Sequence, residues 1–268
     1  MSWEPFAPAE GHTVVGDVRV WHDVHSPGLE PLQRDILALL PPSHGSGRRF
    51  PVLLMHDGLD LFGRRDIEQW RVDETMKELA AEGVEAVVVA IPYGRRPDRG
   101  PQYAGERADA YLAFLVDTVL PLVRDAFDIE PSREATGLAG ASLGGVISLY
   151  GIYAHPRVFG FAGVFSPAFW WNGDRLFETV EQEPAPPARI YLDVGDQEDE
   201  DEERRRAYLD GFQRMTALLH RRGFGDDDLL AVLEKGGRHH ESAWARRLPD
   251  ALRFLLRPFG EARGSGAR

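Results

Sequence analysis

The sequence predicts a single α/β domain built around one mostly parallel sheet with helices on both faces. Two observations carry this prediction: short apolar runs alternate with amphipathic segments along the 268 residues, and no repeat or linker divides them. Such alternation requires crossover connections between parallel strands. We expect about eight strands, the first two forming a hairpin. The domain is expected to span residues 1–260, followed by a disordered tail at residues 261–268.

The expected strands follow one another in order. Residues 13–24 and 33–42 alternate apolar and polar side chains, as strands with one solvated face do, and would form the opening hairpin. The run FPVLLMHDG, residues 50–58, is almost wholly apolar and predicts a central strand covered on both faces. The remaining strands are predicted in residues 85–94, 134–142, 160–169, 188–195 and 228–236.

Amphipathic segments separate these strands. Apolar residues recur at helical spacing in residues 72–80, 112–123 and 208–219, and Gly83 follows the first of these segments as a stop signal. A last helix is expected after the final strand. Pro249 should bend that helix or begin a new one, because proline cannot donate the helical hydrogen bond.

Composition excludes several classes of function. The net charge of -12 argues against nucleic-acid binding, which needs a basic surface. Cysteine is absent, which excludes disulfides, thiolate metal sites and a cysteine nucleophile. The first residues lack the basic and apolar regions of a signal peptide, and no apolar run approaches the ~18 residues of a membrane span, so a cytoplasmic location is expected. No H-E-x-x-H or comparable spacing occurs, and neither metal nor other cofactor is expected.

One serine stands where reactive groups collect in parallel sheets, at the carboxyl end of a predicted strand. In GLAGASLGGVISLYG, residues 140–144 match G-x-S-x-G, in which the serine, here Ser142, takes a strained turn that lifts its hydroxyl above the sheet. The alternative is a turn of small residues without chemistry. As a nucleophile, Ser142 needs a base that is itself oriented by a third group.

The base must follow the serine along the chain, because this motif is followed by the acid and then the histidine. His155 and His220 lie near helix ends, where a cation suits the helix dipole. His239 and His240 lie in a glycine-led loop after the last strand, where a base can reach over the sheet. We favour His239, leaving His240 to begin the helix or contact substrate.

The acid is expected just beyond the strand that ends at Gly195. That strand runs into DQEDEDEERRR, which by itself is typical of a solvated loop and a helix N-terminus. Asp196, Glu198 and Asp199 all qualify by position.

Several ordered motifs together resemble one family. They are VLLMHDGLDLF, GLAGASLGGVISLYG, FSPAFWW, IYLDVGDQE and GGRHHESAW, and the resemblance covers roughly residues 13–257. They are similar to the "Putative esterase" family of α/β-hydrolases, which includes siderophore, feruloyl and acetyl-xylan esterases, S-formylglutathione hydrolases and mycolyltransferases. The resemblance implies an α/β-hydrolase fold, Glu198 as the acid and His239 as the base; the surrounding carboxylates keep Asp196 and Asp199 open.

A tetrahedral intermediate of ester cleavage would need two backbone amides around its oxyanion. One is the amide of Leu143, which follows the nucleophile. The resemblance of DGL to the family's oxyanion loop implies Leu59 as the other donor, with His56 and Asp57 bracing that loop.

The residues that would contact the substrate are predicted from fewer signals than the triad. Few residues separate FSPAF from the next strand, so a large helical lid is not expected and the acyl site should be open. Trp170 and Trp171 would wall it, and suit an aromatic or cyclic substrate, although buried packing is an equal alternative. The other candidates for binding substrate are Tyr93, Tyr103, Arg95 and His240.

The sequence therefore predicts a serine carboxylesterase that acts on a small-molecule ester. A siderophore-trilactone esterase, an acyltransferase that uses the same site, and a catalytically silent binding module are the alternatives.

Overall fold

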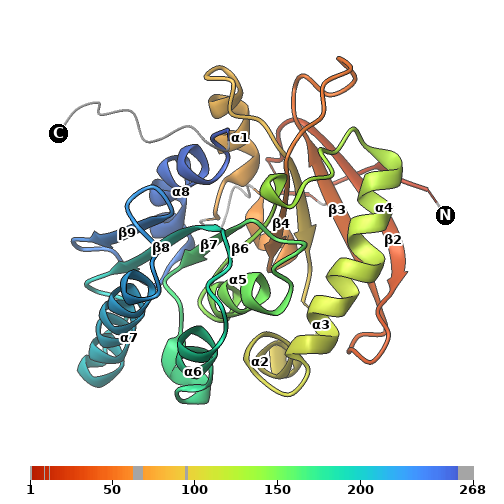
Figure 1. Ribbon diagram of the computed structural model, residues 1–268. Helices are drawn as coiled ribbons and strands as arrows, with labels where there is room; N and C mark the ends of the chain where they lie inside the picture. The colour runs from red at the N-terminus through yellow and green to blue at the C-terminus, as the bar shows by residue number, and fades with distance from the viewer. Residues whose placement is uncertain (1, 9, 12, 63–68, 94–95, 259–268) are drawn as a thin grey trace.

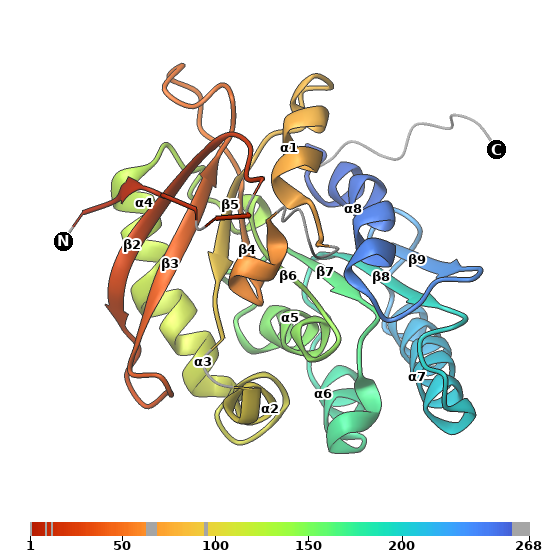
Figure 2. The same ribbon diagram turned by 180° about the vertical axis from the view of Figure 1, so that it is seen from behind.

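A computed structural model describes residues 2–8, 10–11, 13–62, 69–93 and 96–258. Within them the chain forms a nine-stranded sheet in the order β1-β2-β3-β5-β4-β6-β7-β8-β9 (Figures 1 and 2). The strands are β1 (Glu4–Pro5), β2 (Asp17–His25), β3 (Gln33–Leu40), β4 (Val52–His56), β5 (Val87–Ile91), β6 (Thr136–Ala141), β7 (Phe161–Phe165), β8 (Arg189–Gly195) and β9 (Leu229–Glu234).

The sheet is mostly parallel, as predicted. Strands β5, β4, β6, β7, β8 and β9 pair in parallel, whereas β1, β2 and β3 are antiparallel and β2 with β3 forms the expected hairpin. The additional strand β1 was not predicted, because its two exposed residues carry no alternating pattern. The predicted tail at residues 261–268 lies outside the described residues.

Helices cover both faces of this sheet. They are α1 (Val72–Ala80), α2 (Arg96–Ala104), α3 (Ala108–Phe114), α4 (Leu120–Ala126), α5 (Leu143–Ala154), α6 (Arg175–Gln182), α7 (Glu202–Arg221) and α8 (Glu241–Leu255). A π-helical turn, Leu115–Val119, joins α3 to α4. Helices α1 and α8 pack together on one face, and α3, α5 and α7 belong to the apolar cluster of the other (Figures 1 and 2). None of the described helices is both long and apolar enough to cross a membrane.

Two local features differ from what glycine and proline content favours. The segment after β5 is rich in both residues and is nevertheless helical: Arg96–Ala104 forms α2 with Pro101 inside it. Tertiary contacts override the glycine and proline content there: the Gln102 side-chain amide donates to the Glu30 carbonyl at 2.6 Å. Helix α8 continues through Pro249, so no new helix begins there.

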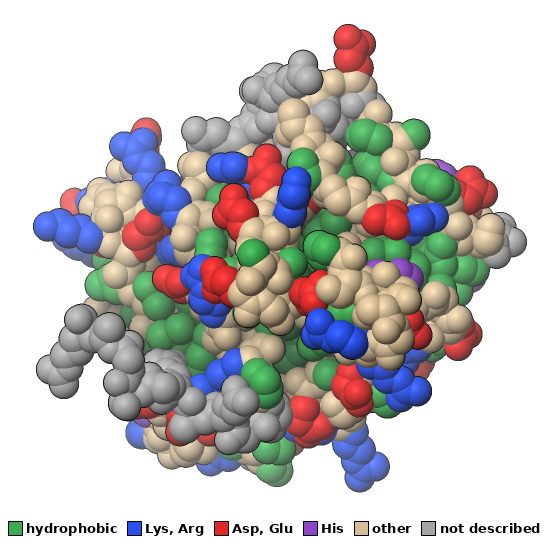
Figure 3. Space-filling model, turned by 90° about the horizontal axis from the view of Figure 1, so that it is seen from above, with side chains coloured by type: hydrophobic (Ala, Val, Ile, Leu, Met, Phe, Trp, Pro, Cys, Tyr) green, Lys and Arg blue, Asp and Glu red, His purple; other side chains and the backbone are tan. Residues whose placement is uncertain are grey.

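The parallel strands place their carboxyl ends at one edge of the sheet. Every residue of β4, β5, β6, β7 and β8 is buried, which fits the continuous apolar runs of their sequences. On the face seen in Figure 3, acidic and basic side chains are interspersed, and its described residues form no continuous basic patch. Because ligands of parallel α/β sheets bind beyond the carboxyl ends of the strands, the loops that leave this edge are the expected position of a site.

Candidate active site

Ser142 occupies the turn between β6 and α5. Its φ and ψ are 58° and -121°, a region that non-glycine residues rarely adopt and that marks a strained turn. A Cβ on Gly140 would lie 2.9 Å from the backbone of Gly144, and one on Gly145 would lie 3.2 Å from the Phe165 carbonyl. The small residues of the motif thus let strand and helix backbones approach closely enough to form this turn.

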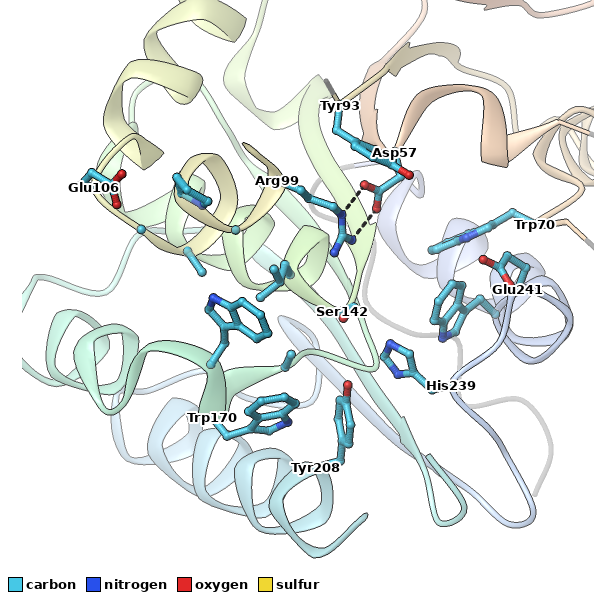
Figure 4. A pocket seen from close by; sticks show the side chains of 18 residues that line it. Asp57, Trp70, Tyr93, Arg99, Glu106, Ser142, Trp170, Tyr208, His239 and Glu241 are labelled. Atoms are coloured by element: carbon cyan, nitrogen blue, oxygen red, sulfur yellow. Dashed lines mark hydrogen bonds and ion pairs between the residues drawn. The ribbon is translucent and has the colours of Figure 1, made fainter. Parts of the chain in front are cut away.

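His239 lies in the loop between β9 and α8, and its imidazole points toward Ser142 (Figure 4). Its Nδ1 lies 2.7 Å from Glu198 Oε2. Because an ionised carboxylate only accepts, Nδ1 carries the proton and Nε2 is left as the basic nitrogen. The ring packs edge-on against Trp244, with centroids 5.1 Å apart, and beside Tyr208 at 5.0 Å.

Among the three carboxylates that position alone left open, Glu198 is the one that contacts His239. Its side chain is fully buried. Asp196 instead accepts a hydrogen bond from the Gly236 amide at 2.6 Å, and Asp199 accepts one from the Asp201 amide at 2.9 Å. These two side chains therefore shape the adjoining loops.

The two segments expected to supply oxyanion amides lie at the ends of neighbouring strands. Leu143 is the first residue of α5, and Leu59 lies in the short 3-10 helix Gly58–Leu61 that follows β4. Arg99 joins these segments: it forms a bidentate ion pair with Asp57 at 2.8 Å and donates to the Ala141 carbonyl at 3.2 Å. The ion pair thus connects the loop after β4 to the residue that precedes Ser142.

His56, the last residue of β4, lies beneath the serine turn and not in the cavity. Its Nδ1 is 2.8 Å from the Tyr111 hydroxyl, and it is almost completely buried. Burial, and to a lesser degree the charge of Arg99, lowers the pKa of His56 to about 3. His56 is therefore neutral near pH 7 and acts as a packing and hydrogen-bonding group.

A cavity of about 780 Å³ opens above Ser142. Trp170 and Trp171 line it with 39% and 54% of their surface exposed, so the expectation that they wall an open site agrees with their positions better than buried packing does. Tyr93 also lines it. Figure 4 shows that the labelled aromatic side chains surround the serine hydroxyl from several directions.

Two expected substrate contacts, Tyr103 and His240, are not found in the lining of this cavity. Tyr103 is 1% exposed, because its ring packs beneath the cavity against His56 and Tyr111. His240 caps the start of α8, where its Nδ1 accepts from the Ser242 amide at 3.3 Å. Arg95 lies outside the described residues.

Sequence reasoning missed two residues next to the reacting groups. Tyr208 was assigned only to the core-facing side of a helix, yet it lines the cavity, and its hydroxyl points toward Ser142 in Figure 4. Burial raises the pKa of Tyr208 to about 12, although the nearby Ser142 opposes this rise, so the hydroxyl stays protonated. Ser166, at the end of β7, was read only as part of a strand. No signal in one sequence separates these residues from ordinary core positions.

Comparisons with known proteins show which family and which folds this chain is similar to. A family model described as "Putative esterase" matches residues 31–255. The uncharacterized protein YbbA of Bacillus subtilis is 27% identical over 232 residues, which cover 81% of this chain and 90% of YbbA. The siderophore triacetylfusarinine C esterase of Aspergillus fumigatus is 29% identical over 141 residues, 46% of this chain and 45% of that protein. The solved enterobactin esterase of Shigella flexneri has a TM-score of 0.71 at 20% identity, covering 95% of this chain and 61% of that one.

Proposed function

Because the chain belongs to the "Putative esterase" family, we propose that it is a serine carboxylesterase in which Ser142, His239 and Glu198 are nucleophile, base and acid. The family and the α/β-hydrolase fold were predicted correctly from the motifs, and both support an enzyme that hydrolyses carboxylic esters. The observation that carries the residue assignment is the buried Glu198 carboxylate 2.7 Å from the Nδ1 of a histidine that faces Ser142 at the cavity floor.

Acylation begins when the Ser142 hydroxyl attacks the carbonyl carbon of the ester. Its proton passes to Nε2 of His239, and Glu198 stabilises the imidazolium that forms. The carbonyl oxygen becomes an oxyanion, which we assign to the backbone amides of Leu143 and Leu59. The intermediate then collapses, the carbon–oxygen bond to the alcohol breaks, and the imidazolium returns the proton to the departing alcohol.

Deacylation repeats the same steps with water. His239 removes a proton from a water molecule as that water attacks the acyl-enzyme, and the acid product leaves when Ser142 regains its proton. An alcohol or sugar in place of water would make the enzyme an acyltransferase. The partial exposure of Trp170 and Trp171, 39% and 54%, supports water access to this side of the cavity.

We propose an ester with an aromatic or cyclic part as the substrate. The aromatic rings that line the cavity support this choice, because such rings bind flat apolar groups well. A siderophore ester is the second candidate, favoured by the name of the Aspergillus fumigatus relative. This chain spans less than half of that relative, so its substrate is a proposal here. A cytoplasmic location and the absence of a nucleic-acid partner stay predictions.

Ser142→Ala tests the proposal. The wild type should hydrolyse p-nitrophenyl acetate and be labelled covalently at Ser142 by a fluorophosphonate, as seen by peptide mass. The variant should lose the label and about 10⁵-fold or more in kcat, because the acyl-enzyme can no longer form. Only the roughly 10³–10⁴-fold acceleration over water that comes from the oxyanion hole and binding should remain. Equal rates in both proteins, or labelling at another serine, would reject Ser142 as the nucleophile. Feruloyl, acetyl-sugar, thioester and ferric-siderophore substrates then rank the candidate esters.

A further inference from the structure

The proposed chemistry leaves the buried hydroxyl of Ser166 without a role. Ser166 directly follows β7 with a φ of 40°, and none of its surface is exposed. Its Oγ donates to Glu198 Oε1 at 2.6 Å. It also accepts from Trp244 Nε1 at 3.0 Å and from Arg247 Nη2 at 2.9 Å.

These contacts fix the direction of the Ser166 proton. A hydroxyl has one proton and two lone pairs. The Trp244 indole and the Arg247 guanidinium only donate, so they occupy the two lone pairs. The single proton is then left for Glu198, the remaining partner and an acceptor. The two donors thus turn a freely rotating hydroxyl into an oriented one.

The orientation of Ser166 determines the orientation of Glu198. Oε1 receives the Ser166 proton and also the Gly195 amide, both at 2.6 Å. With Oε1 occupied in this way, Oε2 is the oxygen that faces His239 Nδ1. We propose that Ser166 is a positioning residue for the esterase reaction, which holds the Glu198 carboxylate in the orientation that keeps the proton of His239 on Nδ1. This inference rests on the proposed function of Ser142, His239 and Glu198.

Helix α8 supplies both side chains that donate to Ser166. Trp244 and Arg247 lie one turn apart on it, and the Trp244 ring also packs edge-on against His239. Arg247 is 6% exposed and its guanidinium forms ion pairs with Asp193 at 3.1 Å, Glu234 at 3.4 Å and Glu198 at 3.9 Å. A buried cation held by several carboxylates has little freedom to move, so the donor to Ser166 is itself fixed.

Ser166→Ala, measured alone and in a Glu198→Gln background, tests the proposal. Ser166→Ala removes a hydrogen bond to a charged carboxylate, so it should lower kcat by about 10- to 100-fold and change KM less than about twofold. In the Glu198→Gln background the same change should lower kcat by less than about twofold, because the group that Ser166 orients no longer holds the correct tautomer.

Ser148→Ala is the matched control, since it deletes another fully buried serine hydroxyl, which donates to the Gly144 carbonyl within α5 at 2.7 Å. It should lower kcat less than about twofold. Should Ser166→Ala fold poorly, Arg247→Lys keeps the buried charge but loses the guanidinium fork, and should lower kcat about threefold with the same dependence on Glu198.

Two results would overturn the inference. One is an equal loss of kcat in both backgrounds, which would show that Ser166 acts independently of Glu198. The other is unchanged kcat in folded Ser166→Ala. Neither result affects the esterase assignment, which fails if the wild type cleaves no ester, or the assignment of Ser142, which fails if Ser142→Ala is as active as the wild type.

Discussion

Replacing Glu198 by glutamine tests whether Glu198, and not Asp196 or Asp199, is the acid of the proposed triad. The amide has nearly the shape of the carboxylate, and its oxygen can still accept from Ser166 and from the Gly195 amide, as Oε1 does. The NH₂ group then faces His239 Nδ1 across the position of the present 2.7 Å contact. Because an amide nitrogen donates, Nδ1 must accept, and the imidazole proton moves to Nε2. Nε2 can then no longer remove the proton of Ser142.

The magnitude follows from this change of tautomer. The Glu198 side chain is fully buried, so no bulk water replaces the lost carboxylate beside His239. The equivalent carboxylate-to-amide change in a Ser-His-Asp triad lowers kcat about 10⁴-fold. At 1.36 kcal/mol for each factor of ten, this corresponds to about 5 kcal/mol of transition-state stabilisation. We expect a loss of about 10³- to 10⁴-fold in kcat here, with KM within about twofold of the wild type.

The assay is steady-state hydrolysis of p-nitrophenyl acetate, with Asp196→Asn and Asp199→Asn as matched controls. Each control also turns one carboxylate of the same acidic run into an amide. Both residues accept hydrogen bonds from loop amides, which an amide oxygen still accepts, so each control should lose less than about tenfold. A Glu198→Gln enzyme with more than a tenth of wild-type kcat, or a control with the larger loss, would refute the assignment of Glu198.

Three further predictions follow. His56 has a folded-state pKa of about 3 and an ordinary value of 6.5, so the unfolded chain binds more protons than the folded chain between these pH values. The free energy of unfolding therefore decreases as the pH is lowered through this range. Urea unfolding should show about 2 kcal/mol of this loss between pH 7 and pH 5, and His56→Asn, which can still pair with Tyr111, should remove it; an unchanged pH dependence would contradict the buried neutral histidine. Gly195→Ala would place a Cβ 2.1 Å from a backbone oxygen of the neighbouring loop and should destabilise the protein by about 2 kcal/mol or more while abolishing activity, whereas Gly225→Ala, with nothing within 4 Å, should stay within about 0.5 kcal/mol in thermal unfolding; similar values would contradict the close approach. Trp171→Ala should raise KM for a feruloyl ester about fivefold and leave KM for p-nitrophenyl acetate and the melting temperature unchanged, since the ring is 54% exposed; equal effects on both esters would exclude it as an aromatic contact.

The sequence was sufficient for the features that depend on order and local pattern. The parallel strands read as apolar runs, and short motifs at strand ends predicted Ser142 and His239 as the nucleophile and base that we propose. The identity of the acid was not determined by position, because Asp196, Glu198 and Asp199 lie within one loop whose path decides which carboxylate turns inward. That path depends on contacts with Gly236 and Ser166, which are distant along the chain.

Helix α2 illustrates the same limit. Its sequence has the glycine and proline content of a loop, and local propensity alone favours one. The segment is helical where Arg99 pairs with Asp57 and Gln102 donates to the Glu30 carbonyl, so its conformation is set by partners outside it. Tyr103 then faces inward from this helix, which explains why a residue expected in the cavity is buried beneath it.

The site also depends on the completion of the fold. Ser142 needs only β6, α5 and their neighbours to take its strained turn, but Glu198 is oriented through Ser166 by Trp244 and Arg247 of α8, the last described helix. The loop that leads into the same helix carries His239. A local opening of α8 would therefore release the proposed acid and base together while leaving the serine turn in place. Because regions of a protein open with different free energies, loss of activity should follow the stability of α8 against β7 and β8 more closely than that of the central strands.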